Sequence, residues 1–529
     1  MLWCGNADRW IKTLPHARCQ TRTMSDAPRK TPTPASAKAR STTPISQAFR
    51  DFIATGWVDQ PPAVPRALEA TSHCETRRAQ LSRLFAETFP QCAIVIPAGE
   101  PKQRSNDTDY PYRPHTAFAY FTGWGSASVP GSVLLGTPRD GGHSWALFTR
   151  PPAPRTTDEF YANAALGEFW TGKRPDLEEV SGLLELGAHD IADFSLESIA
   201  TANPVAMILE AEITLTNELQ LLRSKGTSKT LVKETLEADS YLAQVVSEMR
   251  LIKDAYEIDE LSRAIAATHL GFDDIVAALP KAIGHTRGER IIEGVFNQRA
   301  RLEGNTTGYD TIAASGPHAC ILHWVTNDGP VAQGDLLLVD AGIEMDSLYT
   351  ADITRTIPVG GTFSADQKMI YEAVLEAADA AFSVVKPGAL FRHVHEAAMA
   401  VIARKVHEWG LLPVDLEVSL SPEGQHHRRY MIHGTSHHLG LDVHDCAEAR
   451  REMYLDKELE AGMVFTIEPG LYFQPDDETI PLPWRGIGVR IEDNILVTHD
   501  GGLNLSAAIP RTVAEVEKWL KPSTGRATI

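Results

Sequence analysis

Four acidic residues stand where acids are uncommon, at the ends of β-rich segments. Asp340 and Glu468 each follow an apolar run, Glu492 follows Gly-Val-Arg-Ile, and Asp352 stands in a threonine-rich stretch. Acids are depleted from strand interiors and costly to bury unpaired. Carboxylates that converge at strand ends repel one another unless divalent cations neutralise them. The pattern indicates a metal site, although each acid taken singly could be a solvated turn or cap residue.

A histidine-rich segment could supply a neutral ligand. Residues 433–445, His-Gly-Thr-Ser-His-His-Leu-Gly-Leu-Asp-Val-His-Asp, contain four histidines. Because side chains alternate along a strand, His437 and His438 cannot both face one side, so one should point into a site and the other away. A lone histidine is more often a hydrogen-bonded core residue than a ligand. The clustering with glycine and acids favours a functional role here.

The number of positions between site residues predicts which of them share a strand face. Arg490 is two residues from Glu492, shares its strand face, and could orient a ligand carboxylate. His437 and His444 are seven positions apart, which places them on opposite faces of a regular strand. Gly440 could provide a bend that brings both histidines to one site.

Five motifs in a fixed order carry a resemblance to a known family: Asp340-Ala-Gly, Thr350-Ala-Asp-Ile-Thr-Arg-Thr, the segment 433–445, Ile467-Glu-Pro-Gly-Leu-Tyr and Arg490-Ile-Glu-Asp-Asn. They resemble the motif set of the Xaa-Pro aminopeptidases, also called aminopeptidase P. The resemblance covers nearly all of 245–510. It is weaker in the first domain, where Arg104-Ser-Asn-Asp-Thr-Asp-Tyr and Tyr120-Phe-Thr-Gly are similar to that family's N-terminal domain. It implies an α/β N-terminal domain and an α+β pita-bread (creatinase/aminopeptidase) C-terminal catalytic domain.

The resemblance also implies a dinuclear metal site. Carried over residue by residue, Asp340 would be a terminal ligand of one ion, Asp352 and Glu492 would bridge both ions, and His437 and Glu468 would complete the second. An oxygen-rich set with one imidazole suits Mn²⁺, although Zn²⁺ or Co²⁺ could occupy it. We therefore expect two divalent metal ions per chain, with Mn²⁺ as the leading choice.

Further residues are expected, by the same resemblance, to act on the substrate. Glu468 would move a proton from the attacking water to the leaving proline nitrogen. His323 and His444 would donate hydrogen bonds to the developing oxyanion or the substrate carbonyl. His433 would line the pocket for proline. With Arg490, these residues form the expected catalytic set.

Two features depart from the family pattern. Asp340 and Asp352 are twelve positions apart, one more than the family spacing, so a bulge or longer turn is expected between them. Ala117 stands where relatives often carry an acid that could contact the substrate amine. Another Asp or Glu would then have to bind that amine.

The function that these motifs imply is a metal-dependent exopeptidase that removes an N-terminal residue preceding proline. Proline has no N–H and a restricted φ, so its imide bond fits poorly in the extended grooves of general peptidases. Two metals would lower the pKa of a bridging water and polarise the scissile carbonyl. Two alternatives stay open: a prolidase, which cleaves only Xaa-Pro dipeptides, and a non-catalytic peptide-binding relative. The expected partners are peptides with proline at the second position.

The motifs fall in the second of two predicted domains. Residues 47–244 alternate β-rich runs with helical patterns and end in a helical linker, which predicts an α/β domain. The catalytic domain is predicted over 245–510, followed by a C-terminal tail, 511–529. Within it we expect strands near 335–339, 463–467 and 489–491, and helices near 253–280, 287–301, 364–385 and 390–408.

Residues 1–46 are predicted to be a disordered arm, dispensable for catalysis. From Met24 to about residue 46 the segment is rich in Pro, Ser, Thr, Ala and basic residues, and it has almost no large apolar ones, so it cannot offset the entropy of ordering. Residues 1–23 lack the apolar core of a secretory signal. Met24 could equally be the translation start.

Composition excludes several classes of protein. The chain has 529 residues, of which 43% are hydrophobic and 22% charged, and a formal net charge of −19. Such a charge repels phosphate backbones and anionic lipid, so neither nucleic acid nor a membrane is an expected partner. No apolar run approaches the roughly 18 to 20 residues that span a bilayer. The six cysteines form no CxxC pair, which fits the reducing cytoplasm. We also expect a homo-oligomer, a dimer or tetramer.

Overall fold

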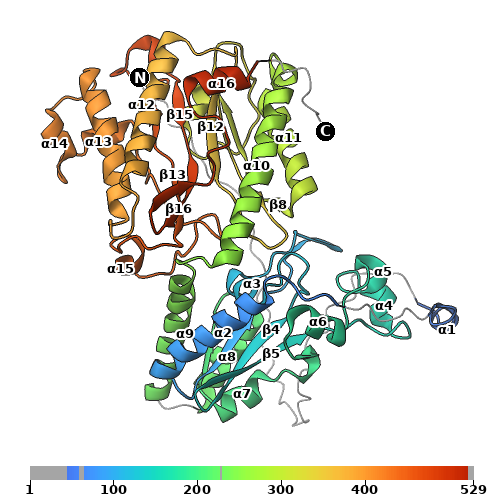
Figure 1. Ribbon diagram of the computed structural model, residues 1–529. Coiled ribbons are helices and arrows are strands. Elements are labelled where there is room, and N and C mark those ends of the chain that lie inside the picture. The colour runs from blue at the N-terminus through green and yellow to red at the C-terminus, as the bar shows by residue number, and fades with distance from the viewer. Residues whose placement is uncertain (1–44, 59–64, 227–228, 522–529) are drawn as a thin grey trace, which may run out of the picture.

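The computed structural model describes residues 45–58, 65–226 and 229–521, without side chains over 226–233. The predicted arm therefore lies outside the described residues, except for residues 45 and 46. Figure 1 shows two lobes, an N-terminal one in blue, teal and green, which includes α9, and a C-terminal one in yellow-green to red. No helix within the described ranges is long and apolar enough to cross a membrane.

The N-terminal lobe is built on a five-stranded mixed sheet in the order β6-β5-β4-β1-β7. Its strands are β1 (Ala93–Pro97), β4 (Val133–Arg139), β5 (Gly142–Thr149), β6 (Ala188–Asp190) and β7 (Val205–Met207). β1 and β5 each pair with one antiparallel and one parallel neighbour. The sheet is covered by helices α2 (Thr71–Thr88), α3 (Thr116–Thr122), α6 (Leu177–Leu184), α7 (Leu196–Ala202), α8 (Ile213–Gly226) and α9 (Lys229–Met249). The α/β organisation predicted for this region is confirmed.

An aromatic arm extends to the side of this lobe (Figure 1). It consists of the short helices α1 (Gln47–Ile53), α4 (Asp158–Ala162) and α5 (Glu168–Thr171). Phe49 packs edge-to-face on Tyr161, and Trp57 packs on Phe160. Phe52, on the outer side of α1, is 78% exposed.

The C-terminal lobe places short antiparallel strands between two pairs of helices (Figure 1). One pair is α10 (Ala255–Ala282) and α11 (Gly288–Glu303), and the other is α12 (Ala365–Ser383) and α13 (Arg392–Glu408). The strands between them form the sheets β12-β10-β9, β13-β16-β17, β14-β15 and β11-β8. Their bounds are β8 (Thr306–Thr307), β9 (Ile312–Ser315), β10 (Leu336–Ala341), β11 (Ile343–Glu344), β12 (Ile353–Pro358), β13 (Val464–Ile467), β14 (Gly470–Tyr472), β15 (Gly488–Arg490), β16 (Asp493–Thr498) and β17 (Gly501–Asn504).

Local sequence signals set the ends of the long helices. Asp254 begins α10 with a capping box to Glu257, and Ser364 begins α12 with one to Gln367. Each of the predicted helices and strands of this lobe is present within two residues of its expected ends. The periodic apolar positions lie in one continuous core between the helix pairs and the strands.

The predicted tail contains a packed helix. α16 (Val513–Trp519) begins with a capping box between Thr512 and Glu515. Val516 and Trp519 are buried in the core of the C-terminal lobe, and the Trp519 indole donates a hydrogen bond to Asp273 on α10. Residues 513–519 of the predicted tail therefore form a helix that packs on the core, because two apolar residues one turn apart can close over it.

Candidate active site

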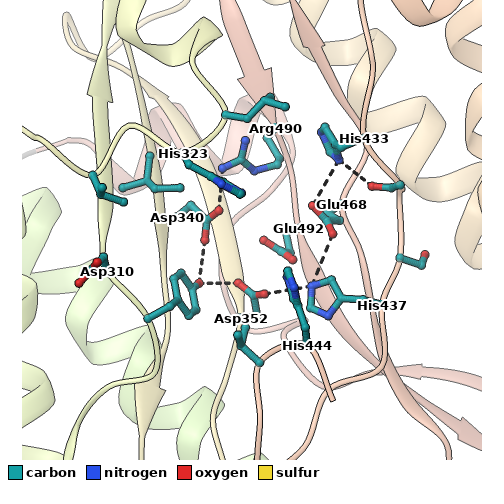
Figure 2. Close-up of a pocket in the computed structure, with 17 residues that line it drawn as sticks. Asp310, His323, Asp340, Asp352, His433, His437, His444, Glu468, Arg490 and Glu492 are labelled. Atoms are coloured by element: carbon teal, nitrogen blue, oxygen red, sulfur yellow. Dashed lines mark hydrogen bonds and ion pairs between the residues drawn. The ribbon is translucent and has the colours of Figure 1, made fainter. Parts of the chain in front are cut away.

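A cavity of about 650 Å³ in the C-terminal lobe brings together every residue that the sequence predicted for the site. It is lined by His323, Asp340, Asp352, His433, His437, His444, Glu468, Arg490 and Glu492, with Tyr309 and Asp310 among the others (Figure 2). These residues come from segments up to about 180 positions apart, so only the tertiary fold assembles them.

The four acids lie where strands begin or end. Asp340 is the next-to-last residue of β10, and Asp352 directly precedes β12. Glu468 directly follows β13, and Glu492 lies between β15 and β16. β10 and β12 are antiparallel neighbours, with Asp340 opposite Thr354, so the first two acids reach the cavity side by side. The predicted placement of carboxylates at strand ends is confirmed.

The predicted ligand atoms are close enough to share an ion. One atom from each of Asp352, His437 and Glu492 lies within 4.8 Å of the others. His437 Nε2 is 3.2 Å from Asp352 Oδ2 and 3.5 Å from Glu468 Oε1. Figure 2 shows these side chains pointing toward one another across the cavity.

The carboxyl groups of this cluster are buried close together, and this raises their pKa values. Burial raises the pKa of Glu468 to about 7, against the opposing charge of His437. Burial and the neighbouring acids hold the pKa of Glu492 well above its usual range, and that of Asp352 is raised for the same two reasons. For His437, burial lowers the pKa, but the hydrogen bond with Asp352 and the charge of Glu468 outweigh it and raise the pKa to about 9.

One oxygen of the cluster has no hydrogen-bond partner within the part of the chain that the structure describes. Glu492 is 1% exposed, and its Oε1 makes no hydrogen bond among the described residues. Its other oxygen, Oε2, accepts a hydrogen bond from the Thr354 hydroxyl at 2.7 Å. A buried carboxylate oxygen without a donor, among raised carboxyl pKa values, fits a divalent cation. The mostly oxygen donor set fits Mn²⁺, and Zn²⁺ or Co²⁺ as well.

Comparison with known proteins decides the family. A profile described as "Metallopeptidase family M24" matches residues 259–499, and one described as "Aminopeptidase P, N-terminal domain" matches residues 74–202. The chain is 43% identical over 489 residues to Xaa-Pro aminopeptidase 1 of Streptomyces coelicolor, covering 91% of this chain and 93% of the relative. The chain belongs to the Xaa-Pro aminopeptidase family. It is therefore a metallopeptidase by family.

Solved structures of this family have the same fold. The Pseudomonas aeruginosa aminopeptidase PepP superposes with a TM-score of 0.72 at 30% identity, covering 87% of this chain and 99% of that one. A zinc-substituted Escherichia coli aminopeptidase P in complex with product matches with the same score and identity over 86% of this chain. The C-terminal lobe thus has the pita-bread fold that the motifs implied.

The bend predicted at Gly440 is confirmed. The Asp445 amide donates to the His438 carbonyl at 2.9 Å, which closes a turn around residues 439–444. The His437 and His444 rings consequently lie 4.2 Å apart, centroid to centroid, on the same cavity. His438 points the other way and stacks on Phe391 inside the core, as the alternation of side chains predicted.

Arg490 contacts a predicted ligand, but one on another strand. Its Nη2 is 2.6 Å from Asp340 Oδ2, and its Nη1 donates to the Tyr472 hydroxyl at 3.1 Å. Tyr472 in turn bonds His433 Nε2 at 2.7 Å. Burial, together with the charge of Arg490, lowers the pKa of His433 to about 4, so this ring is neutral near pH 7. Arg490 and Tyr472 thus connect Asp340 to His433.

Sequence reasoning missed Tyr309, Thr354 and Tyr472. Tyr309 donates to Asp340 Oδ1 at 2.7 Å and also contacts Asp352. Thr354 and Tyr472 lie inside the motifs 350–356 and 467–472, so the alternation of side chains along these strands could have indicated that they face the site. Nothing in the sequence marks Tyr309, which reaches the acids across more than 30 residues of chain.

The region between Asp340 and Asp352 holds the turn that the longer spacing required. The chain reverses over residues 345–348, where the Leu348 amide donates to the Met345 carbonyl at 2.8 Å. Leu348 has a left-handed backbone with φ of 74°, a conformation that is unfavourable for leucine.

Ala117 is buried in α3 and does not line the active-site cavity. It lines a second hollow of about 860 Å³ between the two lobes, and His444 lines both this hollow and the active-site cavity. Asp310, next to Tyr309, is the acid on the active-site wall that the sequence did not single out.

Proposed function

We propose that this chain is a dinuclear-metal aminopeptidase that hydrolyses the bond between an N-terminal residue and a following proline. The observation that carries the proposal is the cluster of five potential ligands in one cavity, including the unpartnered Glu492 Oε1. The identity to a Xaa-Pro aminopeptidase over 91% of the chain supports the choice of substrate.

Five residues would hold the two ions, and they are Asp340, Asp352, His437, Glu468 and Glu492. We propose Mn²⁺ as the native metal because most of these donors are carboxylates. When bound, the ions supply a water of lowered pKa and polarise the scissile carbonyl.

The protein's own groups would move the protons. Glu468 is a half-buried carboxylate on the cavity wall, 3.5 Å from His437 and 3.6 Å from His433, which is the type of group that acts as a general acid–base. It would take a proton at its carboxylate from the attacking water and deliver it to the proline nitrogen, which must be protonated to leave. His323 and His444 line the same cavity and would donate hydrogen bonds to the oxygen of the scissile carbonyl.

The remaining cavity residues would bind the substrate. His433, held neutral and bonded to Tyr472, would line the proline site. Arg490 would hold Asp340 in place through their 2.6 Å contact. Since Ala117 has no charge, we propose Asp310 as the carboxylate that binds the substrate amine.

We also propose a homo-oligomer in the cytoplasm. Phe52, Phe169 and Trp170 of the aromatic arm are 78%, 62% and 49% exposed, and neighbouring exposed apolar side chains are typical of a protein contact.

The cysteines inside the described ranges, Cys74, Cys92, Cys320 and Cys446, are all unpaired, which suits a reducing compartment. We propose an N-terminal domain over 47–244 and a catalytic domain over 245–510, against which α16 of the C-terminal tail packs.

A substrate panel tests the proposed function. Purified enzyme with defined metal should cleave Ala-Pro-Ala after the first residue and leave Ala-Ala-Ala intact. Faster cleavage of Ala-Pro than of Ala-Pro-Ala would make the chain a prolidase instead. Peptide binding without any cleavage, in protein that takes up no metal ions when Mn²⁺ is supplied, would make it a non-catalytic relative.

A further inference from the structure

The loop between β9 and β10 carries His323 to the active-site cavity. It comprises residues 316–335 and begins with a 3₁₀ helix (Gly316–Cys320). His323 itself is exposed, so whatever fixes its position acts on the loop that carries it.

Glu289 binds this loop at four points. It lies in the first turn of α11 with a side chain that is 0% exposed. Its Oε1 accepts from the Ser315 amide at 2.8 Å and is 2.8 Å from His318 Nδ1. Its Oε2 accepts from the Gly329 amide at 2.7 Å and from the Trp324 indole at 2.9 Å. Both ends of the segment 315–329 and two points inside it therefore bind one carboxylate.

The four bonds require a carboxylate. All four acceptor positions of the two oxygens are used, and a glutamine would place an NH₂ group against two of the donors. The backbone is also shaped to this contact, because a Cβ at Gly329 would lie 2.8 Å from Glu289 Oε2. The His318 and Trp324 rings stack at 3.8 Å, so the two side-chain donors support each other.

Along the chain, His323 lies between two residues that are held by hydrogen bonds, Cys320 and Trp324. On its N-terminal side, the Cys320 carbonyl accepts from the Gln474 side-chain amide at 2.9 Å. On its C-terminal side, the adjacent Trp324 is the residue that donates to Glu289. Only two residues separate His323 from Cys320, so the backbone position of His323 is determined by these two contacts.

We propose that Glu289 is a positioning residue that holds His323 at the wall of the active-site cavity. Glu289 does not line the cavity itself and acts through the loop. The kinetic consequence rests on the proposed function, whereas the effect on the loop does not.

The experiment is a double-mutant cycle combined with hydrogen exchange. Glu289→Gln should lower kcat/KM for Ala-Pro-Ala by roughly 10-fold or more and leave the metal content per chain unchanged, as expected for a displaced hydrogen-bond donor. His323→Ala should lower it strongly in the wild-type background and have little further effect in the Glu289→Gln background. Amide exchange over 316–329 should be faster in Glu289→Gln, with or without substrate.

Glu293→Gln is the matched control, since it removes the same charge from the same helix without breaking any of the four bonds. Trp324→Phe removes one donor and provides a milder variant if Glu289→Gln does not fold; its effect should likewise vanish in a His323→Ala background. Additive effects of Glu289→Gln and His323→Ala, or unchanged exchange over 316–329, would overturn the proposal. If wild-type enzyme cleaves no proline peptide, the proposed function fails while the exchange measurement still decides the role of Glu289.

Discussion

At the scale of single residues, the proposed metal centre depends on the carboxylates of the cavity. Glu492→Ala should abolish both peptide hydrolysis and binding of two metal ions, because in the proposed ligand set Glu492 would serve both ions. Metal content by elemental analysis and kcat on Ala-Pro-Ala are measured on the same preparation. Glu396→Ala, which removes a 60% exposed acid on α13, is the control and should retain both. Two bound ions with near-normal turnover in Glu492→Ala would disprove the ligand assignment.

His444 should separate catalysis from metal binding. Its ring is 4.2 Å from that of His437, yet among the described residues it makes no hydrogen bond to any of the four acids, and burial lowers its pKa to about 4. We expect His444→Ala to lower kcat by about 10²-fold to 10³-fold, as for loss of one preorganised donor, with unchanged metal content. Loss of metal in proportion to activity would instead make His444 a ligand.

Residue chemistry explains which site residues could be predicted. Acids at strand ends and clustered histidines are anomalies of type and position, so Asp340, Glu468 and His437 could be noticed in the sequence. Tyr309 is an ordinary residue in an ordinary loop, and only the packing of the β8–β9 segment against β10 brings its hydroxyl to the acids. Its contribution could not be inferred without the fold.

At the scale of elements, the tight turn at Gly440 aligns two histidines. A Cβ at Gly440 would lie 2.3 Å from Asp445 Oδ2 and 3.2 Å from Lys253 Cε. Gly440→Ala should therefore destabilise the protein by about 1–3 kcal/mol through overpacking and also lower metal affinity, because His437 lies three residues away. Thermal unfolding and metal titration measure the two effects. Gly294→Ala, on α11 with open space around the added Cβ, should neither destabilise the protein nor weaken metal binding; equal losses in the two variants would contradict this role for Gly440.

Helices and strands were more predictable than the short elements at the margins. α10 and α12 have long amphipathic patterns and capping boxes, so local signals agree with their tertiary role. α16 has only seven residues, and its capping box alone did not show that Trp519 packs on the core. The pairing of strands into four small sheets depends on contacts between distant segments and was not predicted.

At the scale of the whole molecule, buried ion pairs join the two lobes near the active site. Lys253 and Arg250, which lie between α9 and α10, bind the 1% exposed Asp445 at 3.2 and 3.0 Å. Asp445→Asn should destabilise the protein by about 3–5 kcal/mol because it removes the carboxylate that pairs with the buried Lys253 and leaves Arg250 with only Asp442, at 3.4 Å. Denaturant unfolding measures this loss. Asp500→Asn, at an exposed turn after β16, is the control, and a loss of similar size in both variants would contradict the assignment.

The segment before the first described helix should be unnecessary for catalysis. Every predicted site residue lies beyond residue 320, and Ser46, whose side chain caps α1, can be retained. A chain beginning at Ile45 should keep kcat and KM for Ala-Pro-Ala within about 2-fold of the full-length values, since the effects of changes far from the site are small. A truncated chain that folds but loses most of its activity would show that residues 1–44 take part in function.

The most direct test of the central claim is a metal titration of the stripped enzyme. Metal is removed by chelation, Mn²⁺ is added back in steps, and bound ions per chain and cleavage of Ala-Pro-Ala are measured together. Because the proposed set of five ligands would hold two ions, activity should rise to its maximum as occupancy reaches two ions per chain, and Glu492→Ala should show no such rise. Full activity in the stripped enzyme, or an unchanged titration in Glu492→Ala, would contradict the account.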